Sequence, residues 1–310
     1  MKYLFGPVNS RRLGISLGVD LVPHKTCSLN CVYCECGDTT ALVTDVAEWV
    51  PTREVIAELD EYLEGSPRLD VLTFSGSGEP TLHSGIGEII THIRTRYPQY
   101  RIAVLTNGTM LVDPGVRRSI RDADIVVPSL DAVSPDLFER IARPAPGVRI
   151  DEVIEGLVDF RREFRGLLLL EIFVVPGVND GDDELAALKD ACLRIRPDRI
   201  QLNTLDRPGA VHWIRPATVG ELDSIATRFA PLETEIIGGP AGDEAVPARR
   251  PADLEKTVLL TLRRRPSTIA DLRATLGVDA KLIEGVLSSL REAGMVKVER
   301  LERGDFYRVV

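Results

Sequence analysis

The chain has 310 residues, of which 44% are hydrophobic, and a formal net charge of −9 at pH 7. A chain of this length can bury a large core and is predicted to hold two domains, while its acidic balance argues against a protein that coats nucleic acid. The longest apolar stretch, residues 166–178, is interrupted by Glu171 and Pro176, so no membrane span is predicted.

Short β-branched runs alternate with amphipathic helical runs along the first three quarters of the chain. The strands are predicted at 17–22, 71–75, 101–106, 125–129, 167–175 and 199–203, and the helices at 52–63, 86–96, 134–141, 151–164, 183–195 and 219–228. Strict alternation favours a parallel sheet with right-handed crossovers, which curl it toward a barrel. Six units fall short of the eight in a closed barrel. The fold class is therefore predicted to be α/β, a partial (βα)6 barrel.

The last part of the chain has a different pattern. Residues 238–251 are rich in glycine and proline and are predicted to be a linker between domains at 1–237 and 252–310. Beyond the linker we predict helices at 254–264, 268–276 and 279–293, then a β-ribbon from 295–299 and 306–309. This order is typical of a small winged helix-turn-helix domain. Such domains bind DNA or proteins, and both interpretations stay open.

Three cysteines, Cys27, Cys31 and Cys34, form a CxxxCxxC motif in one predicted loop. They supply one thiolate fewer than a closed iron–sulfur cluster or tetrahedral zinc site needs, so a fourth metal position stays open to a small molecule. The alternative is a zinc site with Cys36 as fourth ligand, but zinc modules usually join two CxxC pairs a dozen or more residues apart. The spacing favours an iron–sulfur cluster. Since no secretory signal precedes these thiols, we expect a reducing, cytoplasmic location.

The predicted strands end in glycine or polar residues, at the edge where parallel α/β folds place their chemistry. These ends are the cysteine loop and residues 75–81, 106–108, 128–131, 175–180 and 203–208. Each of them alone is compatible with ordinary turn chemistry. Because six such ends converge on one mouth, the sequence predicts a site there.

Four of these motifs together resemble the radical S-adenosylmethionine (SAM) superfamily. They are the CxxxCxxC loop with Tyr33 before its last cysteine, GSGEP at 76–80, TNG at 106–108 and PGVND at 176–180. The resemblance covers residues 3–237. It implies that Cys27, Cys31 and Cys34 hold three irons of a 4Fe–4S cluster and that SAM chelates the fourth.

By matched position, the resemblance also implies the SAM contacts. The amino group of SAM would lie near Gly76, Gly78 and Glu79, and the ribose and carboxylate near Asn107, Ser129 and Asp131. The adenine would lie near Tyr33 and the backbone from Val175 to Val178.

A narrower resemblance lies at the N-terminus. Residues 6–8 (GPV), 10–14 (SRRLG) and 16–20 (SLGVD) are similar to the signature of proteins related to wyosine-base (4-demethylwyosine) synthases. The wyosine enzymes carry additional N-terminal cysteines for a second cluster, whereas this sequence has none before Cys27. The narrower resemblance therefore concerns ancestry and leaves the substrate open.

The resemblance implies reductive cleavage of SAM to a 5′-deoxyadenosyl radical, which abstracts a hydrogen atom from an RNA base or a small metabolite. The electron donor would be a flavodoxin or ferredoxin. Lys25, Arg12, Arg143, Arg207 and His212 are candidates for binding an anionic substrate, although each is compatible with an ordinary solvated or salt-bridged surface group.

Two other functions are compatible with the sequence. One is an activase that installs a radical on a partner protein docked by the winged helix. The other is an iron–sulfur regulator that senses redox state and binds DNA. Strand ends that bind SAM would have no function in such a regulator. Cys36 is open to three interpretations: a hydrogen-atom donor, an auxiliary ligand or an ordinary thiol.

Overall fold

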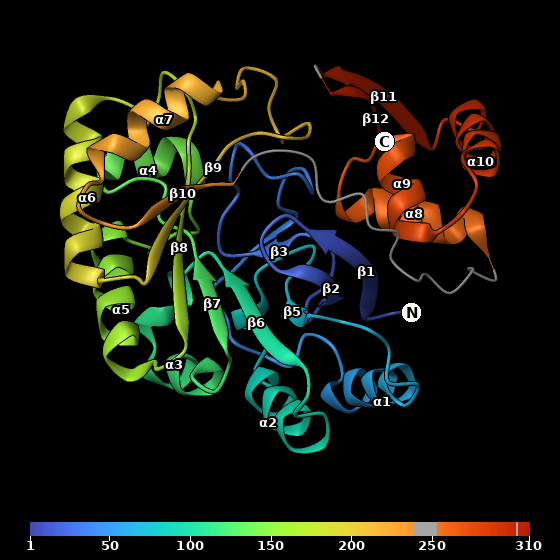
Figure 1. Ribbon diagram of the computed structural model, residues 1–310, viewed down its shortest axis with the longest axis horizontal. Coiled ribbons are helices and arrows are strands. Elements are labelled where there is room, and N and C mark those ends of the chain that lie inside the picture. Colours follow the sequence, from blue (N-terminus) through green and yellow to red (C-terminus); the bar gives the residue numbers. More distant parts are fainter. Residues whose placement is uncertain (238–252, 302) are drawn as a thin grey trace.

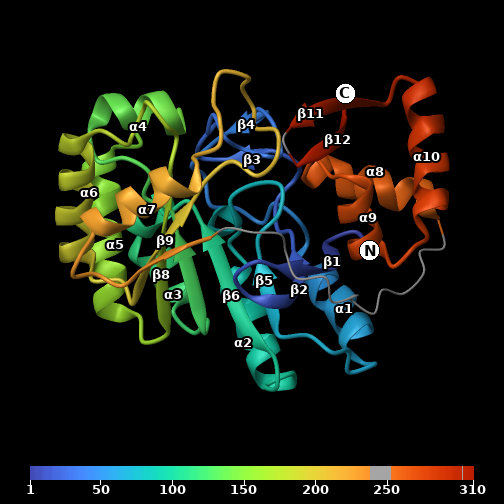
Figure 2. The same ribbon diagram turned by 45° about the horizontal axis from the view of Figure 1, so that its top comes forward.

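The structure is a computed structural model that describes residues 1–237, 253–301 and 303–310. The linker predicted at 238–251 lies outside the described residues. Figures 1 and 2 show a large α/β part, coloured from blue through yellow to light orange, with a smaller part in darker orange and red beside it. In the described part of the chain, no helix has the length and apolar character needed to cross a membrane.

The main sheet has eight strands in the order β1-β2-β5-β6-β7-β8-β9-β10. Their bounds are Leu4–Ser10 for β1, Gly14–Val19 for β2, Val71–Phe74 for β5, Arg101–Thr106 for β6, Ile125–Pro128 for β7, Leu167–Phe173 for β8, Arg199–Asn203 for β9 and Thr234–Ile236 for β10. β1 runs antiparallel to β2, and every other neighbouring pair is parallel. The predicted α/β class with a parallel sheet is confirmed.

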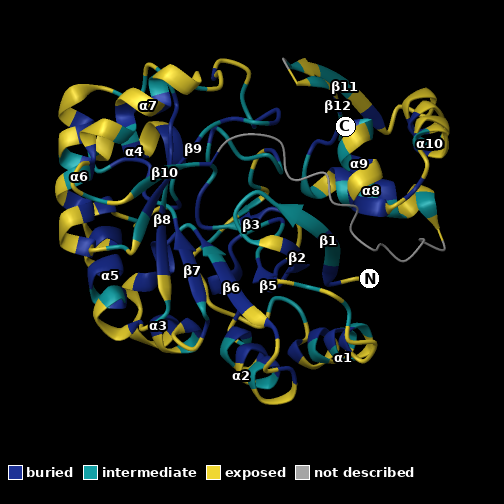
Figure 3. Ribbon diagram, in the orientation of Figure 1, coloured by how far each residue is buried: buried dark blue, intermediate teal, exposed yellow. Residues whose placement is uncertain are grey.

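The crossover helices cover the outer side of the sheet (Figure 1). They are α1 (Thr52–Leu63), α2 (Ile86–Arg96), α3 (Pro114–Ile120), α4 (Pro135–Ala142), α5 (Ile150–Glu163), α6 (Asp182–Ile195) and α7 (Val219–Arg228), with 3₁₀ turns η1 (Pro80–Leu82) and η2 (Thr109–Val112). Each longer helix buries one stripe, as α1 does with Val55, Leu59 and Leu63, because residues four apart share a helix face. The exposed outer faces are visible in Figure 3.

Several elements differ from the predictions. β1, β10 and α3 were not among the predicted elements, and β2 begins at Gly14 and ends at Val19, earlier than the predicted strand at 17–22. The other five predicted strands agree with the structure to within two residues. A further strand pair, β3 (Thr26–Cys27) and β4 (Ala41–Leu42), lies within the cysteine loop.

The smaller part contains α8 (Leu254–Arg264), α9 (Ile269–Leu276), α10 (Ala280–Glu292) and the antiparallel strands β11 (Val296–Leu301) and β12 (Gly304–Val309). These elements occur in the predicted order. They have a core of their own, in which Val258, Leu272, Ile283, Leu287 and Leu290 are buried. α9 packs against β1, the edge strand of the main sheet.

Candidate functional site

The three motif cysteines lie on one loop after β2, and nitrogen donors point at two of their sulfurs. Lys25 Nζ donates to Cys34 Sγ over 3.0 Å, and Asn107 Nδ2 donates to Cys27 Sγ over 3.5 Å. The Lys25 side chain is buried. Such N–H···S contacts are how proteins tune cysteine-ligated iron–sulfur clusters, so this thiol environment fits the cluster implied by the motif.

The thiols differ in their readiness to ionise. Burial raises the pKa of Cys27 to about 12 and the pKa of Cys31 well above its ordinary value. For Cys34 a hydrogen bond from Cys36, together with the Lys25 ammonium, lowers the pKa below its ordinary value. Thiolates are the metal-binding form. Of the three motif cysteines, Cys34 is therefore the one whose protein surroundings favour the thiolate.

The turn at residues 76–79 packs directly on the cysteine loop. Lys25 N donates to Ser77 O over 2.8 Å, and Glu79 N donates to Thr26 O over 3.1 Å. A Cβ atom on Gly78 would lie 2.0 Å from Thr26 O, and one on Gly76 would lie 2.4 Å from Asp20 Cγ. Gly76 also has φ +145°, which favours glycine. The two glycines are therefore required for the close approach of the turn to the loop.

Glu79 joins this turn to the end of the next strand. Its carboxylate is buried and accepts hydrogen bonds from Thr81 N (3.1 Å) and Thr81 Oγ1 (2.6 Å). It also accepts from Thr106 Oγ1 (2.6 Å) and Asn107 N (2.7 Å). Burial raises its pKa, while these donors oppose the shift. Two of these bonds fix the local turn at Thr81, and the other two join the segment after β5 to the end of β6.

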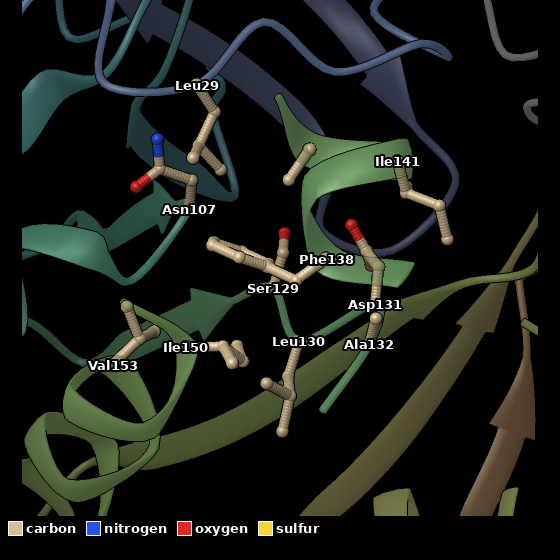
Figure 4. A pocket seen from close by; sticks show the side chains of 11 residues that line it. Leu29, Asn107, Ser129, Leu130, Asp131, Ala132, Phe138, Ile141, Ile150 and Val153 are labelled. Carbon is tan, nitrogen blue, oxygen red and sulfur yellow. The ribbon is translucent and has the colours of Figure 1, made fainter. Parts of the chain in front are cut away.

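Asn107, Ser129 and Asp131 line one small cavity at the ends of β6 and β7 (Figure 4). Leu29 of the cysteine loop and apolar side chains from α4 and α5 complete its wall. Asp131 accepts hydrogen bonds from Tyr33 Oη and, over 2.8 Å, from Phe173 N. Burial raises the pKa of Asp131 to about 7.

Tyr33 connects the cysteine loop to the carboxyl ends of β7 and β8. Its ring stacks on Phe173, with the ring centroids 3.9 Å apart and the planes 11° from parallel. Since Tyr33 also donates to Asp131, one side chain contacts the ends of both β7 and β8.

Asn179 is a site residue to which the sequence interpretation gave no role. Its side chain is buried, and Nδ2 donates to Asp131 O and Phe173 O, both over 2.8 Å. Its Oδ1 accepts from Val175 N over 2.8 Å. Asn179 therefore fixes the backbone at two predicted SAM-contact residues. The available signal was an asparagine just after a Pro-Gly turn, since asparagine amides often bond nearby backbone groups.

The smaller part of the chain also reaches the site. Arg264 Nε lies 3.2 Å from Asp20 Oδ2, and that carboxylate accepts a hydrogen bond from Ser77 Oγ over 2.9 Å. Cys36 Sγ also lies 2.7 Å from the backbone carbonyl oxygen of Arg264. Nearby, Arg207 pairs with Asp271 of α9 over 2.7 Å. The C-terminal part thus contacts the cysteine loop at Cys36 and is linked to the 76–79 turn through Asp20.

The predicted site residues gather at the carboxyl edge of the sheet. These are Cys27, Cys31, Cys34, Tyr33, Gly76, Gly78, Glu79, Asn107, Ser129, Asp131 and Val175. Among the described residues, no three His, Cys, Asp or Glu side chains lie close enough together to bind a single metal ion.

The basic candidates for an anionic substrate lie in different surroundings. Lys25 belongs to the cysteine loop. Arg12 forms a largely buried pair with Glu171 of β8, and Arg207 joins the two parts of the chain through Asp271. Arg143 is half-buried near Asp38, and His212 is exposed. The salt-bridged interpretation holds for Arg12, Arg143 and Arg207.

Comparisons with known proteins identify the family. Residues 21–188 match the family model of the radical SAM superfamily. The chain is 35% identical over 209 residues to a UPF0026 protein of Helicobacter pylori, with 67% of each chain covered. It is 34% identical over 298 residues to a protein of Brachyspira hyodysenteriae named GTPase Obg, and spans 96% of its own length but only 44% of that protein.

A solved structure supports the fold. The structure of TYW1 with a lysine-pyruvate adduct bound matches with a TM-score of 0.55 at 17% identity, covering 73% of this chain and 75% of that one. At this identity the likeness concerns the fold alone. The family match, which spans more than half of the chain, shows that it belongs to the radical SAM superfamily, whose enzymes use a 4Fe–4S cluster and SAM.

Proposed function

We propose that this chain reductively cleaves SAM to methionine and a 5′-deoxyadenosyl radical, which abstracts a hydrogen atom from an RNA base or a small metabolite. The observation that carries the proposal is the contact between the cysteine loop and the glycine turn, in which Ser77 O accepts from Lys25 N and Thr26 O accepts from Glu79 N. A loop that presents three thiols against bare backbone suits a metal centre with one ligand position left for a small molecule.

In this proposal Cys27, Cys31 and Cys34 hold three irons of the cluster. When bound, the cluster supplies one electron to SAM at low potential. The chain's own contribution is electrostatic and steric. Lys25 and Asn107 donate to two of the sulfurs, and Lys25 places a positive charge beside Cys34, which stabilises its anionic form.

The surrounding strand ends position SAM. We assign its amino group to the backbone at Gly76 and Gly78 and to Glu79, whose carboxylate is positioned by hydrogen bonds from Thr81, Thr106 and Asn107. Asn107, Ser129 and Asp131 are assigned to the ribose and carboxylate. The adenine lies near Tyr33 and the backbone at Val175. The apolar walls from α4 and α5 help to exclude water from a reactive radical.

We further propose a division into a radical SAM domain at 1–237 and a winged helix-turn-helix domain at 252–310. The element order α8-α9-α10-β11-β12 supports the second assignment. The N-terminal GPV, SRRLG and SLGVD runs support common ancestry with the wyosine-base synthases. In this proposal, a flavodoxin or ferredoxin delivers the electron in the cytoplasm, and the winged helix binds a substrate or a partner protein.

Anaerobic reconstitution with iron, sulfide, dithionite and SAM tests the proposed function. We expect 5′-deoxyadenosine from the wild-type chain and none from Cys31→Ala. The matched control is Cys192→Ala, which removes a fully buried core thiol and should keep both iron content and 5′-deoxyadenosine formation. Turnover by Cys31→Ala, or none by the wild-type protein with a full iron complement, would refute the proposal.

A further inference from the structure

A cavity of about 560 Å³ opens at the end of the sheet opposite the cysteine loop. Its lining includes the first residue of each of the five strands β5 to β9, namely Val71, Arg101, Ile125, Leu167 and Arg199. The turn between β1 and β2 contributes Arg11 and Arg12, and β10 contributes Glu235. The cavity therefore lies at the amino ends of the parallel strands, between the two edge strands of the sheet. Its volume suits a small organic molecule.

One face of β8 connects this cavity to the candidate SAM site. Alternate residues of a strand point to the same side, and each step of two residues advances about 7 Å. On β8, Leu169 lines the cavity, Glu171 binds Arg12 and Phe173 stacks on Tyr33. A single residue layer, the Arg12–Glu171 pair, thus separates the cavity from the ring that packs at the SAM site.

The separating layer is polar. Gln201 lines the cavity and accepts from Arg12 over 3.3 Å, while Asn203 Nδ2 lies 3.5 Å from Glu171 Oε2. The Arg12 and Glu171 side chains are only 14% and 12% exposed. A buried ion pair of this kind is weak as a source of stability, so its position between two cavities calls for another role.

The charges around the cavity are only partly balanced. Glu235 pairs with Arg199 over 2.9 Å, and Asp70 Oδ2 accepts from the backbone N–H of Ile15 over 2.7 Å. Arg12 is held by Glu171. For Arg11 and Arg101, no carboxylate of the described residues lies within ion-pair distance. Among the described residues, Arg11 and Arg101 therefore line the cavity without an ion-pair partner, and against the one unpaired carboxylate there, Asp70, they leave one positive charge in excess.

We propose that this cavity binds a small molecule through an anionic group, either a carboxylate or a phosphate, held by Arg11 and Arg101. The rest of the molecule extends along β8 toward the Arg12–Glu171 pair and the SAM site. Guanidinium forks match the geometry of both anions. The ligand's role as the substrate of hydrogen abstraction rests on the proposed function, whereas the anion site itself does not.

Isothermal titration of the full chain, reconstituted with its cluster, tests the site at constant ionic strength. The probes are inorganic phosphate, acetate, glycerol as an uncharged control and a short single-stranded RNA. We expect phosphate or acetate to bind and glycerol not to bind, and the stronger of the two anions indicates which group the ligand carries. The double variant Arg11→Gln/Arg101→Gln should bind that anion at least tenfold more weakly.

The matched control is Arg53→Gln/Arg118→Gln, which removes two exposed arginines that do not line the cavity and should leave anion affinity unchanged. Equal losses in both double variants, or no binding of either anion to the wild-type chain, would overturn the proposal. So would RNA binding that depends on Arg11 and Arg101 while both small anions fail to bind. Circular dichroism of each variant establishes that it is folded.

Formation of 5′-deoxyadenosine by the same wild-type preparation separates the two proposals. Anion binding without 5′-deoxyadenosine would refute the proposed function and keep the anion site. The opposite result, 5′-deoxyadenosine without anion binding, would refute the site alone.

Discussion

Replacing Arg264 with alanine should destabilise the chain and disturb the candidate SAM site together. Arg264 and Asp20 are 16% and 7% exposed, and their closest atoms are 3.2 Å apart. Breaking a buried pair by removing one partner costs about 3–5 kcal/mol, because the remaining charge stays buried. Since Arg264 keeps some exposure and Asp20 keeps its bonds to Ser77, we expect about 3 kcal/mol, the lower end of that range.

The loss should depend on pH in a defined direction. Burial raises the pKa of Asp20, and Arg264 opposes that shift. Without the guanidinium, the folded-state pKa rises further above the unfolded value of about 3.9. A buried carboxyl whose pKa is raised on folding destabilises the protein least below its unfolded-state pKa. The protein then loses stability as the pH rises through the folded-state pKa. The deficit of Arg264→Ala should therefore be larger at pH 8 than at pH 5.

Urea unfolding of the metal-free chain measures the free-energy change, and SAM titration of the reconstituted protein measures the effect on the site. The control is Arg300→Ala, since Arg300 is 86% exposed in its pair with Asp305 and should change stability by less than about 0.5 kcal/mol. Adding Asp20→Asn to Arg264→Ala should recover much of the loss. If the two single variants behave alike, or the second substitution recovers nothing, the buried-pair reasoning is wrong.

Three further predictions concern single contacts. Gly78→Ala should lower both the urea midpoint and the amount of bound iron, because the added Cβ would lie 2.0 Å from Thr26 O. The control Gly181→Ala, whose Cβ would meet nothing within 4 Å, should change neither. Equal effects of the two substitutions would contradict the packing argument. Asn179→Ala should lower the free energy of unfolding by about 2–4 kcal/mol, because it breaks three buried hydrogen bonds. A loss below about 1 kcal/mol in urea unfolding would show that the loop after β8 does not need these bonds. Burial holds the pKa of His83 below its usual range, so the stability of the wild-type chain should fall as the pH drops through about 6.5. His83→Gln should flatten this pH dependence in urea titrations at pH 5 to 8. The same slope of stability against pH in both proteins would contradict a buried neutral imidazole.

The parallel strands and most helices could be predicted from the sequence because each carries a strong local pattern. β1 could not, since Pro7 interrupts its run and proline is compatible only with edge positions of a sheet. β10 has only three residues, too few for any periodicity. α3 was missed although its signal was present: Asp113 caps the helix and Pro114 occupies its first position.

The candidate site also has one part that the sequence predicts and one part that it does not. The cysteines and glycines are adjacent in sequence, so their spacing already contains the chemistry. The pairs Arg12–Glu171 and Asp20–Arg264 join residues 159 and 244 positions apart, and no local pattern encodes such contacts. The interpretation of the C-terminal part as a separate recruiting module therefore lacked its ion pair with Asp20, the residue that also bonds Ser77.

The position of α9 against β1 also has a consequence for solubility. β1 is an edge strand of an eight-stranded sheet, and an uncovered edge offers unpaired backbone groups on which another chain can add a strand. The C-terminal part shields this region. A fragment that ends at residue 237 should therefore self-associate through this edge, more than the full chain does.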